Sequence, residues 1–218
     1  MEDVIKPLSK PDTYTIFPIP IPSSDSDLTK FSTLRLLALR TDPSLFGSTY
    51  ARELAFTPEV WRSRLDLDGR VTFVVSDEER RGEWIGTMSL LGPDALKDIP
   101  HDIPKEILRR GDLFNLVGLW VHPDHRGRGL GSRLVRAGFN YVEKYSRGSM
   151  EDIPMDNRLC AAPINEEQSR VAPDGDRKAR LVVLKVSKDN EGARALYVKE
   201  GFLEWENGDA AWMTRTVS

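Results

Sequence analysis

The stretch HPDHRGRGLGSRL, residues 122–134, brings three glycines and three arginines together in one short segment. It follows the apolar run LFNLVGLWV and leads into a segment where Leu130, Leu134, Gly138 and Tyr141 recur at helical spacing, so a strand, a turn and a helix are predicted. Backbone N–H groups and the helix dipole favour an anion at such a helix start. The sequence therefore predicts a pyrophosphate site here, with a solvated basic turn as the alternative.

The spacing of the glycines can be compared with the known motifs that bind nucleotide phosphates. A P-loop needs Lys followed by Ser or Thr after its second glycine, and this chain has neither there. The dinucleotide fingerprint would begin at Gly127 and Gly129 but finds Ser132 in third place. It also needs an acidic residue at the end of a following strand, where this chain has a polar segment around residues 146–152. A nicotinamide dinucleotide is thus disfavoured.

The same stretch resembles the acetyl-CoA turn of the GNAT superfamily of N-acetyltransferases. That family's pattern, Arg/Gln-x-x-Gly-x-Gly/Ala, is matched by Arg126, Gly129 and Gly131. The resemblance covers most of the chain, roughly residues 13–217. A second family block, Asn-x-x-Ala-x-x-Leu-Tyr-x-x-x-Gly-Phe, is matched by Asn190, Ala193, Leu196, Tyr197, Gly201 and Phe202.

The resemblance implies an α/β (α+β) GNAT fold. Its sheet would be mixed, mostly antiparallel and six- to seven-stranded, with the fourth and fifth strands splayed and about four helices. We expect a tail over residues 1–12 and a single domain over residues 13–218, with insertions at about 92–112 and 146–176. The second insertion is rich in Gly, Pro, Ser and Asp and is predicted to be a mobile loop. Gly118 interrupts an apolar strand, which indicates a bulge or a close approach of backbone, with simple relief of packing as the alternative.

Local patterns predict several further elements. The proline-containing residues 13–22 favour an edge strand, because proline cannot donate to a central ladder. Cap residues before Leu28, and Thr57 followed by Pro58, predict two helix starts. Further predicted elements are a hairpin within residues 70–92, a short helix within residues 104–110, a strand over residues 180–187, a helix over residues 190–202 and a closing hairpin that turns at Asn207 and Gly208.

The resemblance also implies a cosubstrate and a reaction. The chain would use acetyl-CoA, without a metal, to acetylate a primary amine by direct attack in a ternary complex. Backbone groups left unpaired by the splay would bond the pantetheine arm, and the glycine turn would bind the pyrophosphate. The predicted cofactor-binding residues are Leu119, Trp120, Val121, Arg126, Gly127, Arg128, Gly129, Leu130, Gly131, Ser132, Asn190, Ala193 and Tyr197.

Tyr197 is the expected general acid, because a phenol with a reference pKa of about 10 stays protonated at neutral pH. From helical spacing alone Tyr197 is also a core residue. Many family members have a glutamate base near the position of Asn115, and an amide cannot accept a proton. Asp112, His122 or His125 could act through water, or the amine could arrive neutral.

The overall composition and charge exclude some classes of binding partner and indicate a cellular compartment. A formal charge of −3 argues against a protein that binds nucleic acid through a broad basic surface. Cys160 is the single cysteine, and no uncharged run is long enough to span a bilayer, so we expect a soluble cytoplasmic or nuclear protein, monomeric or homodimeric. The sequence does not identify the acceptor amine. Two alternative functions also remain, a non-catalytic acyl-CoA-binding module and a dinucleotide-binding oxidoreductase. Acidic residues near the expected acceptor site, which could attract a cationic amine, are Asp42, Glu53, Glu204, Glu206 and Asp209.

Overall fold

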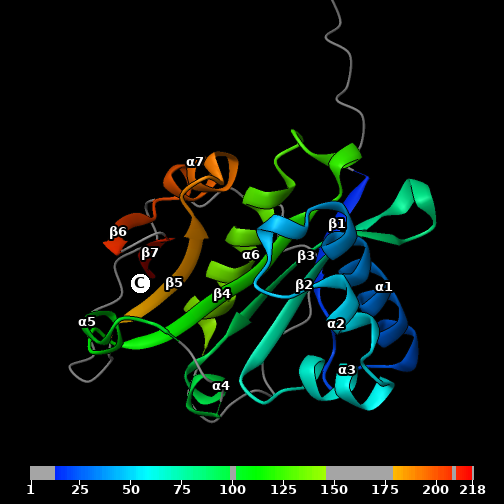
Figure 1. The fold of residues 1–218 in the computed structure, drawn as a ribbon, viewed down its shortest axis with the longest axis horizontal. Coiled ribbons are helices and arrows are strands. Elements are labelled where there is room, and N and C mark those ends of the chain that lie inside the picture. The colour runs from blue at the N-terminus through cyan, green and yellow to red at the C-terminus, as the bar shows by residue number, and fades with distance from the viewer. Residues whose placement is uncertain (1–12, 99–101, 146–178, 208–209, 218) are drawn as a thin grey trace, which may run out of the picture.

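The computed structural model describes residues 13–98, 102–145, 179–207 and 210–217. These residues form one seven-stranded sheet in the order β1-β2-β3-β4-β5-β7-β6 (Figure 1). All neighbouring strands pair antiparallel except β4 and β5, which are parallel. The predicted mixed sheet is thus confirmed. The strands are β1 (Tyr14–Pro18), β2 (Arg70–Asp77), β3 (Glu83–Leu91), β4 (Asp112–Val121), β5 (Arg180–Ser187), β6 (Leu203–Asn207) and β7 (Ala210–Val217).

The described helices include those predicted from cap residues. Ser24 caps the first long helix in a capping box with Asp27, and Thr57 caps a helix whose first residue is Pro58. More helices are present than the four expected. They are α1 (Asp25–Thr41), α2 (Tyr50–Leu54), α3 (Pro58–Leu65), α4 (Pro93–Asp98), α5 (Lys105–Leu108), α6 (Leu130–Lys144) and α7 (Glu191–Lys199), with single 3-10 turns at Pro43–Leu45, Glu78–Arg80 and Pro123–His125.

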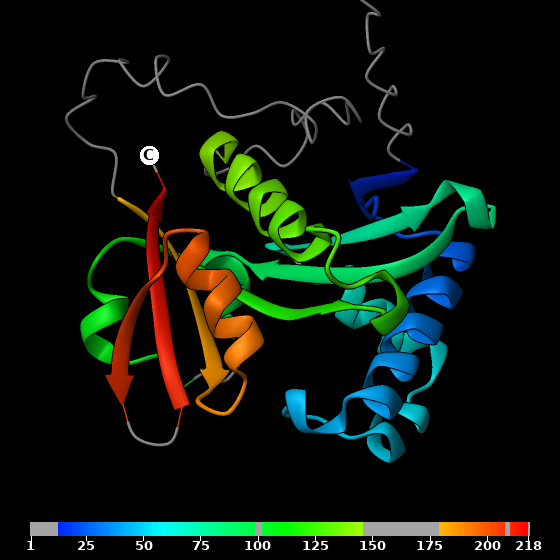
Figure 2. The ribbon, with the colours of Figure 1, turned by 90° about the horizontal axis from the view of Figure 1, so that it is seen from above.

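The helices cover both faces of the sheet (Figure 2). On one face α6 and α7 enclose the largest apolar cluster, in which Leu134, Phe139 and Tyr197 pack against strand residues such as Phe114. On the other face α1 and α3 pack against the sheet around Trp61 and other apolar side chains. These four helices present buried apolar side chains to the sheet, and this burial is the main stabilising term.

The segment expected to be a polar insertion, residues 92–112, is in part a packed element. The predicted short helix exists as α5, but α4 was not predicted. Ala95, Leu96, Ile103 and Ile107 are buried in a third apolar cluster with strand residues of β4, β5 and β7. The correction has a physical reason, since six residues are too few to display a helical repeat.

The two ends of the sheet agree with the expected edge strand and hairpins. β1 lies at one edge and pairs only with β2, in agreement with Pro18 at its end, which has no N–H to donate to a further strand. At the other edge, Asn207 pairs with Ala210, which confirms the closing hairpin, while residues 208–209 lie outside the described chain. The predicted tail over residues 1–12 and the loop over residues 146–176 also lie outside it. Within the described residues, no helix is both long and apolar enough to cross a bilayer.

Candidate active site

The parallel strands β4 and β5 separate part of the way along their length. They pair from Asp112 opposite Arg180 to Asn115 opposite Val183. Beyond Asn115, the described part of β4 pairs only with β3, so backbone groups on its other side face the gap. The splay expected between the fourth and fifth strands is confirmed, and Figure 1 shows the two strands diverging.

A bulge in β4 accompanies the splay. On β4, Val117 pairs with Ser89 of β3 and Trp120 pairs with Thr87 of β3. Two residues of β4, Gly118 and Leu119, therefore lie opposite the single β3 residue between Thr87 and Ser89. Gly118 has a φ of 67°, in the left-handed region that favours glycine. The extra residue reverses the alternation of side chains, so Trp120 packs toward α1 instead of toward α6. The bulge predicted at Gly118 is thus confirmed.

The glycine turn leads from β4 into α6. Gly127 and Gly129 each have a φ of 74°, and Gly129 is the N-cap of α6 without a side-chain capping bond. The N–H of Arg133 donates the first helical bond, to Gly129 O at 3.0 Å. The N–H groups of the preceding helical residues therefore have no intrahelical partner, which is the geometry that binds phosphate at a helix start.

A cleft of about 1230 Å³ runs along the splay and past the turn. We call it the interstrand cleft. Every predicted cofactor-binding residue except Arg128 lines it. The structure thus gathers residues of β4, of the turn and of α7 around one cleft, although they are up to about 80 positions apart in the sequence. Asn115 and His125 line the cleft as well.

The first arginine of the motif is fixed by internal contacts. Arg126 Nε donates to Val121 O at 2.9 Å, and its Nη2 donates to Asp42 Oδ2. Trp120 Nε1 donates to the same carboxylate oxygen at 2.7 Å. Burial alone would raise the pKa of Asp42, but the hydrogen bonds from Trp120 and Arg126 and the charge of Arg126 lower it overall. Asp42 therefore joins the end of α1 to the turn.

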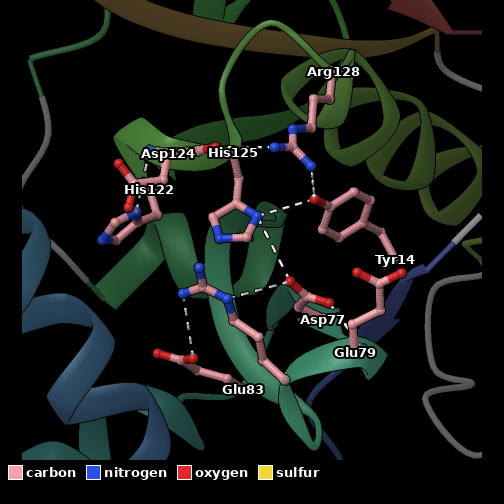
Figure 3. Close-up of polar contacts among 9 residues, drawn as sticks. Tyr14, Asp77, Glu79, Glu83, His122, Asp124, His125 and Arg128 are labelled. Carbon is pink, nitrogen blue, oxygen red and sulfur yellow. Dashed lines mark hydrogen bonds and ion pairs between the residues drawn. The ribbon is translucent and has the colours of Figure 1, made fainter.

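His125 lies beneath the turn in a polar cluster (Figure 3). Its Nδ1 is 3.0 Å from Tyr14 Oη and 3.8 Å from Asp77 Oδ2, while Arg128 donates to the same tyrosine oxygen. Burial and the charge of Arg80 lower the pKa of His125, although Asp77 opposes the shift. The imidazole is therefore neutral at neutral pH, and its Nε2 has no hydrogen-bond partner among the described residues.

The other two candidate bases do not line the interstrand cleft. Asp112 lies at the start of β4, at the opposite end of the strand from the turn. His122 lies after β4, and its Nδ1 accepts a hydrogen bond from Asp124 N at 3.3 Å. Of the three candidates, only His125 lines the cleft, and it does so beside Arg126 rather than beside Asn115.

Tyr197 reaches the cleft from α7. Its side chain is buried in the core formed with Phe202 and Phe139, and burial raises its pKa above the ordinary value. The phenol is thus protonated at neutral pH. Asn190 is the N-cap of α7, since its Oδ1 accepts from Ala193 N at 3.1 Å. Both Tyr197 and Asn190 line the cleft.

The end of the cleft away from the turn is lined by three arginines. Arg35, Arg64 and Arg70 line this end, from α1, α3 and β2. Sequence reasoning missed all three, because they are dispersed along the chain and no motif joins them.

The acidic residues considered as attractants for a cationic amine are not free for that role where the structure describes their side chains. Glu53 accepts from Arg35 Nε and Nη2 at 3.0 and 2.9 Å. Glu204 accepts from Arg194 Nη2 at 2.9 Å, and Asp42 is bound as described above. The side chain of Glu206, and Asp209 as a whole, lie outside the described part.

Comparison with known proteins gives a consistent result. The model of the acetyltransferase (GNAT) family matches residues 34–151, which is more than half of the chain. A search of curated protein sequences gave no match.

Solved structures share the fold at low sequence identity. A GNAT-family acetyltransferase from Streptococcus pneumoniae is 16% identical with a TM-score of 0.56, over 94% of this chain and 99% of that one. NAA60 from Arabidopsis thaliana in complex with acetyl-CoA is 17% identical with a TM-score of 0.57, again over 94% and 99%. The ribosomal-protein-S5-alanine acetyltransferase from Vibrio fischeri is 15% identical with a TM-score of 0.58, over 96% of each chain.

Proposed function

This chain belongs to the acetyltransferase (GNAT) family, and from that premise we propose that it transfers an acetyl group from acetyl-CoA to a primary amine. The observation that supports this most directly is the interstrand cleft, which joins a helix-start phosphate site to unpaired strand backbone and to a buried phenol. The Arabidopsis thaliana NAA60 structure, which shares the fold, is a complex with acetyl-CoA.

Two backbone regions of the cleft would bind the cosubstrate. The free N–H groups at the start of α6 match the pyrophosphate in charge and geometry. Leu119, Trp120 and Val121 lie beyond the last pairing with β5, so their outward backbone groups are accessible to the pantetheine amides. Arg126 contributes through the turn that it stabilises, since Asp42 and Val121 bind its guanidinium. Arg128 contacts Tyr14 and lies outside the cleft lining.

Tyr197 is the proposed general acid. The amine nitrogen forms a bond to the thioester carbonyl carbon, the carbon–sulfur bond breaks, and the sulfur takes its proton from the phenol. The raised pKa of Tyr197 keeps that proton in place before the reaction. No second side chain is needed for this step.

We propose that the amine reacts in its neutral form, without a base in direct contact. Asn115 is an amide, Glu53 is fixed by Arg35, and Asp102 is paired with Lys185. The guanidinium of Arg35 also disfavours a second positive charge nearby, which lowers the pKa of a bound amine. Water then accepts the amine proton, and His125 could receive it only through water because it lies at the turn.

The Tyr197→Phe substitution tests the acid. We expect kcat to fall about 100-fold, because a general acid contributes roughly that much, while the dissociation constant for acetyl-CoA stays unchanged. The measurement is CoA thiol release together with calorimetric titration. Wild-type kcat should show no loss up to about pH 10, since the pKa of Tyr197 lies above the ordinary phenol value. A kcat that Tyr197→Phe leaves intact would contradict the assignment.

Calorimetric titration with acetyl-CoA, CoA and NADH tests the cosubstrate. Saturable binding of acetyl-CoA without binding of NADH is the expected result. Binding without CoA release in the presence of any amine would favour a non-catalytic acyl-CoA-binding module instead. A folded sample that binds no acetyl-CoA would refute the proposed function.

A further inference from the structure

The end of the interstrand cleft away from the glycine turn has an excess of positive charge that its own residues do not neutralise. Arg35, Arg64 and Arg70 form what we call the arginine cluster, and Glu53 is the carboxylate in contact with it. Of these three guanidinium groups, Arg35 pairs closely with Glu53, Arg64 lies 3.8 Å from it, and Arg70 is bound by other groups. Among the described lining residues of the cleft, the acidic member is Asp102, which pairs with Lys185.

Glu53 neutralises only one member of the cluster at close range. It is fully buried and bidentate to Arg35 at 2.9 and 3.0 Å. Burial alone would raise the pKa of Glu53, but the hydrogen bond and charge of Arg35, with smaller contributions from Ser48 and Arg64, lower it. Arg64 Nη2 lies 3.8 Å from Glu53 Oε1, too far for a hydrogen bond.

Arg70 is bound by neutral groups in the structure. Its Nη1 donates to Arg64 O at 2.9 Å, its Nη2 to Ser89 Oγ at 2.9 Å, and its Nε to Thr72 Oγ1 at 3.3 Å. Burial, then the charges of Arg64 and Arg35, lower the pKa of Arg70 to about 10. A guanidinium in such surroundings is stabilised by an additional anion.

The cluster lies close to the bulge where the strands separate. Arg35 Nη1 is 4.0 Å from the position at which a Cβ would stand on Gly118. Gly118 precedes the backbone residues proposed to bind the pantetheine arm, so the acetyl group would arrive near this point. An amine and an anion held by Arg64 and Arg70 can therefore belong to one small molecule.

We infer that the acceptor is a small amine that also has an anionic group, a carboxylate or a phosphate, bound by Arg64 and Arg70. This inference rests on the proposed acetyl transfer and names its substrate class. Arginine binds planar and tetrahedral oxyanions through paired N–H donors, which suits both kinds of anion. The inferred acceptor with an anionic group differs from the purely cationic amine that the acidic residues in the sequence suggested.

Matched pairs of acceptors test the inference on the full-length protein. Each of the common L-amino acids is compared with its amide, and phosphoethanolamine with ethanolamine, by CoA thiol release at saturating acetyl-CoA. For at least one pair we expect kcat/KM, expressed per concentration of the neutral amine, to be about 10- to 100-fold higher for the anionic member, the range for hydrogen bonds to charged groups. The two kinds of pair separate carboxylate from phosphate.

Arg64→Gln is the diagnostic variant, because Arg64 is partly exposed and has one distant ion pair. Arg64→Gln should lower kcat/KM for the anionic member far more than for its neutral partner, and so remove most of the preference, while the affinity for acetyl-CoA stays unchanged. Arg62→Gln is the matched control, since Arg62 is on the same helix but contacts Asp25 and Ser23 outside the cleft. That variant should keep the preference.

The outcomes separate this inference from the proposed function. Equal or better use of neutral amines by the wild-type protein overturns the inference but leaves acetyl transfer intact. The inference is also overturned if Arg64→Gln and Arg62→Gln show the same preference, or if peptides with an acidic second residue are acetylated far better than any small anionic amine. Absence of acetyl-CoA binding in titration refutes the proposed function itself.

Discussion

At the scale of single residues, Asp42 connects two parts of the site that are distant in sequence. One carboxylate oxygen accepts hydrogen bonds from the indole of Trp120 and from Arg126, so the end of α1, the bulged strand and the glycine turn meet at this atom. Trp120 is 3% exposed, and its N–H would be buried without a partner if the carboxylate were removed. An unsatisfied buried donor costs more than an average hydrogen bond contributes.

Asp42→Ala is therefore expected to lower the free energy of unfolding by about 2 kcal/mol. Urea titration followed by tryptophan fluorescence measures the change. Asp25→Ala is the control, because Asp25 pairs with Arg62 but its side chain is 94% exposed, and such pairs contribute less than about 1 kcal/mol. Similar losses in both variants would show that Asp42 has no special role.

The pH dependence of this contribution follows from the lowered pKa of Asp42. A carboxyl group whose pKa is lowered by folding adds stability above its unfolded pKa of about 3.9, and this is lost as the pH falls through the folded value. The difference between wild type and Asp42→Ala should thus be constant above about pH 5 and become smaller below about pH 4. A difference that already shrinks at pH 6 would contradict the assignment.

At the scale of elements, His125 connects the turn after β4 to the first two strands through side-chain contacts. It contacts Tyr14 on β1 and Asp77 on β2, and its ring stands edge-on to Tyr14 with centroids 5.7 Å apart (Figure 3). Folding lowers its pKa, so the unfolded chain binds more protons below about pH 6.5. Stability is then complete above that pH and is lost as the pH falls.

His125→Phe should therefore flatten the stability profile between about pH 7 and pH 5, because the phenyl ring keeps the packing but cannot be protonated. Thermal unfolding over this pH range gives the profile. Tyr14→Phe is the matched control, since it removes the same hydrogen bond but leaves the imidazole in place, and it should keep the slope. A slope that persists in His125→Phe would assign the pH dependence to another group.

Structural features that depend on adjacent residues could be predicted from the sequence, whereas contacts between separate elements could not. The turn around Gly129 and the start of α7 at Asn190 were predicted because each is specified by residues adjacent in the chain. At Gly118 a lone glycine in an apolar strand predicted either a bulge or a close approach of backbone, and the structure shows the bulge. The arginine cluster was not predicted, because its three members come from α1, α3 and β2, and contacts between separate elements leave no characteristic spacing in the sequence.

At the scale of the whole molecule, the sheet is two parts joined over a short parallel pairing. β1 to β4 form one part and β5 to β7 the other, and β4 meets β5 over only four residue pairs before the strands separate. The turn and α6 follow the first part, while α7 belongs to the second. A ligand in the interstrand cleft contacts both parts, so it binds the folded protein and not the unfolded chain.

Acetyl-CoA at about 100 times its dissociation constant should then add about 2.7 kcal/mol to the free energy of unfolding, and NADH at the same concentration should add nothing. Urea titration gives the energy, and hydrogen exchange locates it. Because the proposed contacts span the cleft, amide exchange should slow both in β4 at residues 119–121 and at the start of α7 near Asn190. Slowing confined to the glycine turn would mean that the ligand binds by its phosphates alone, and that the splayed strands do not receive the pantetheine arm.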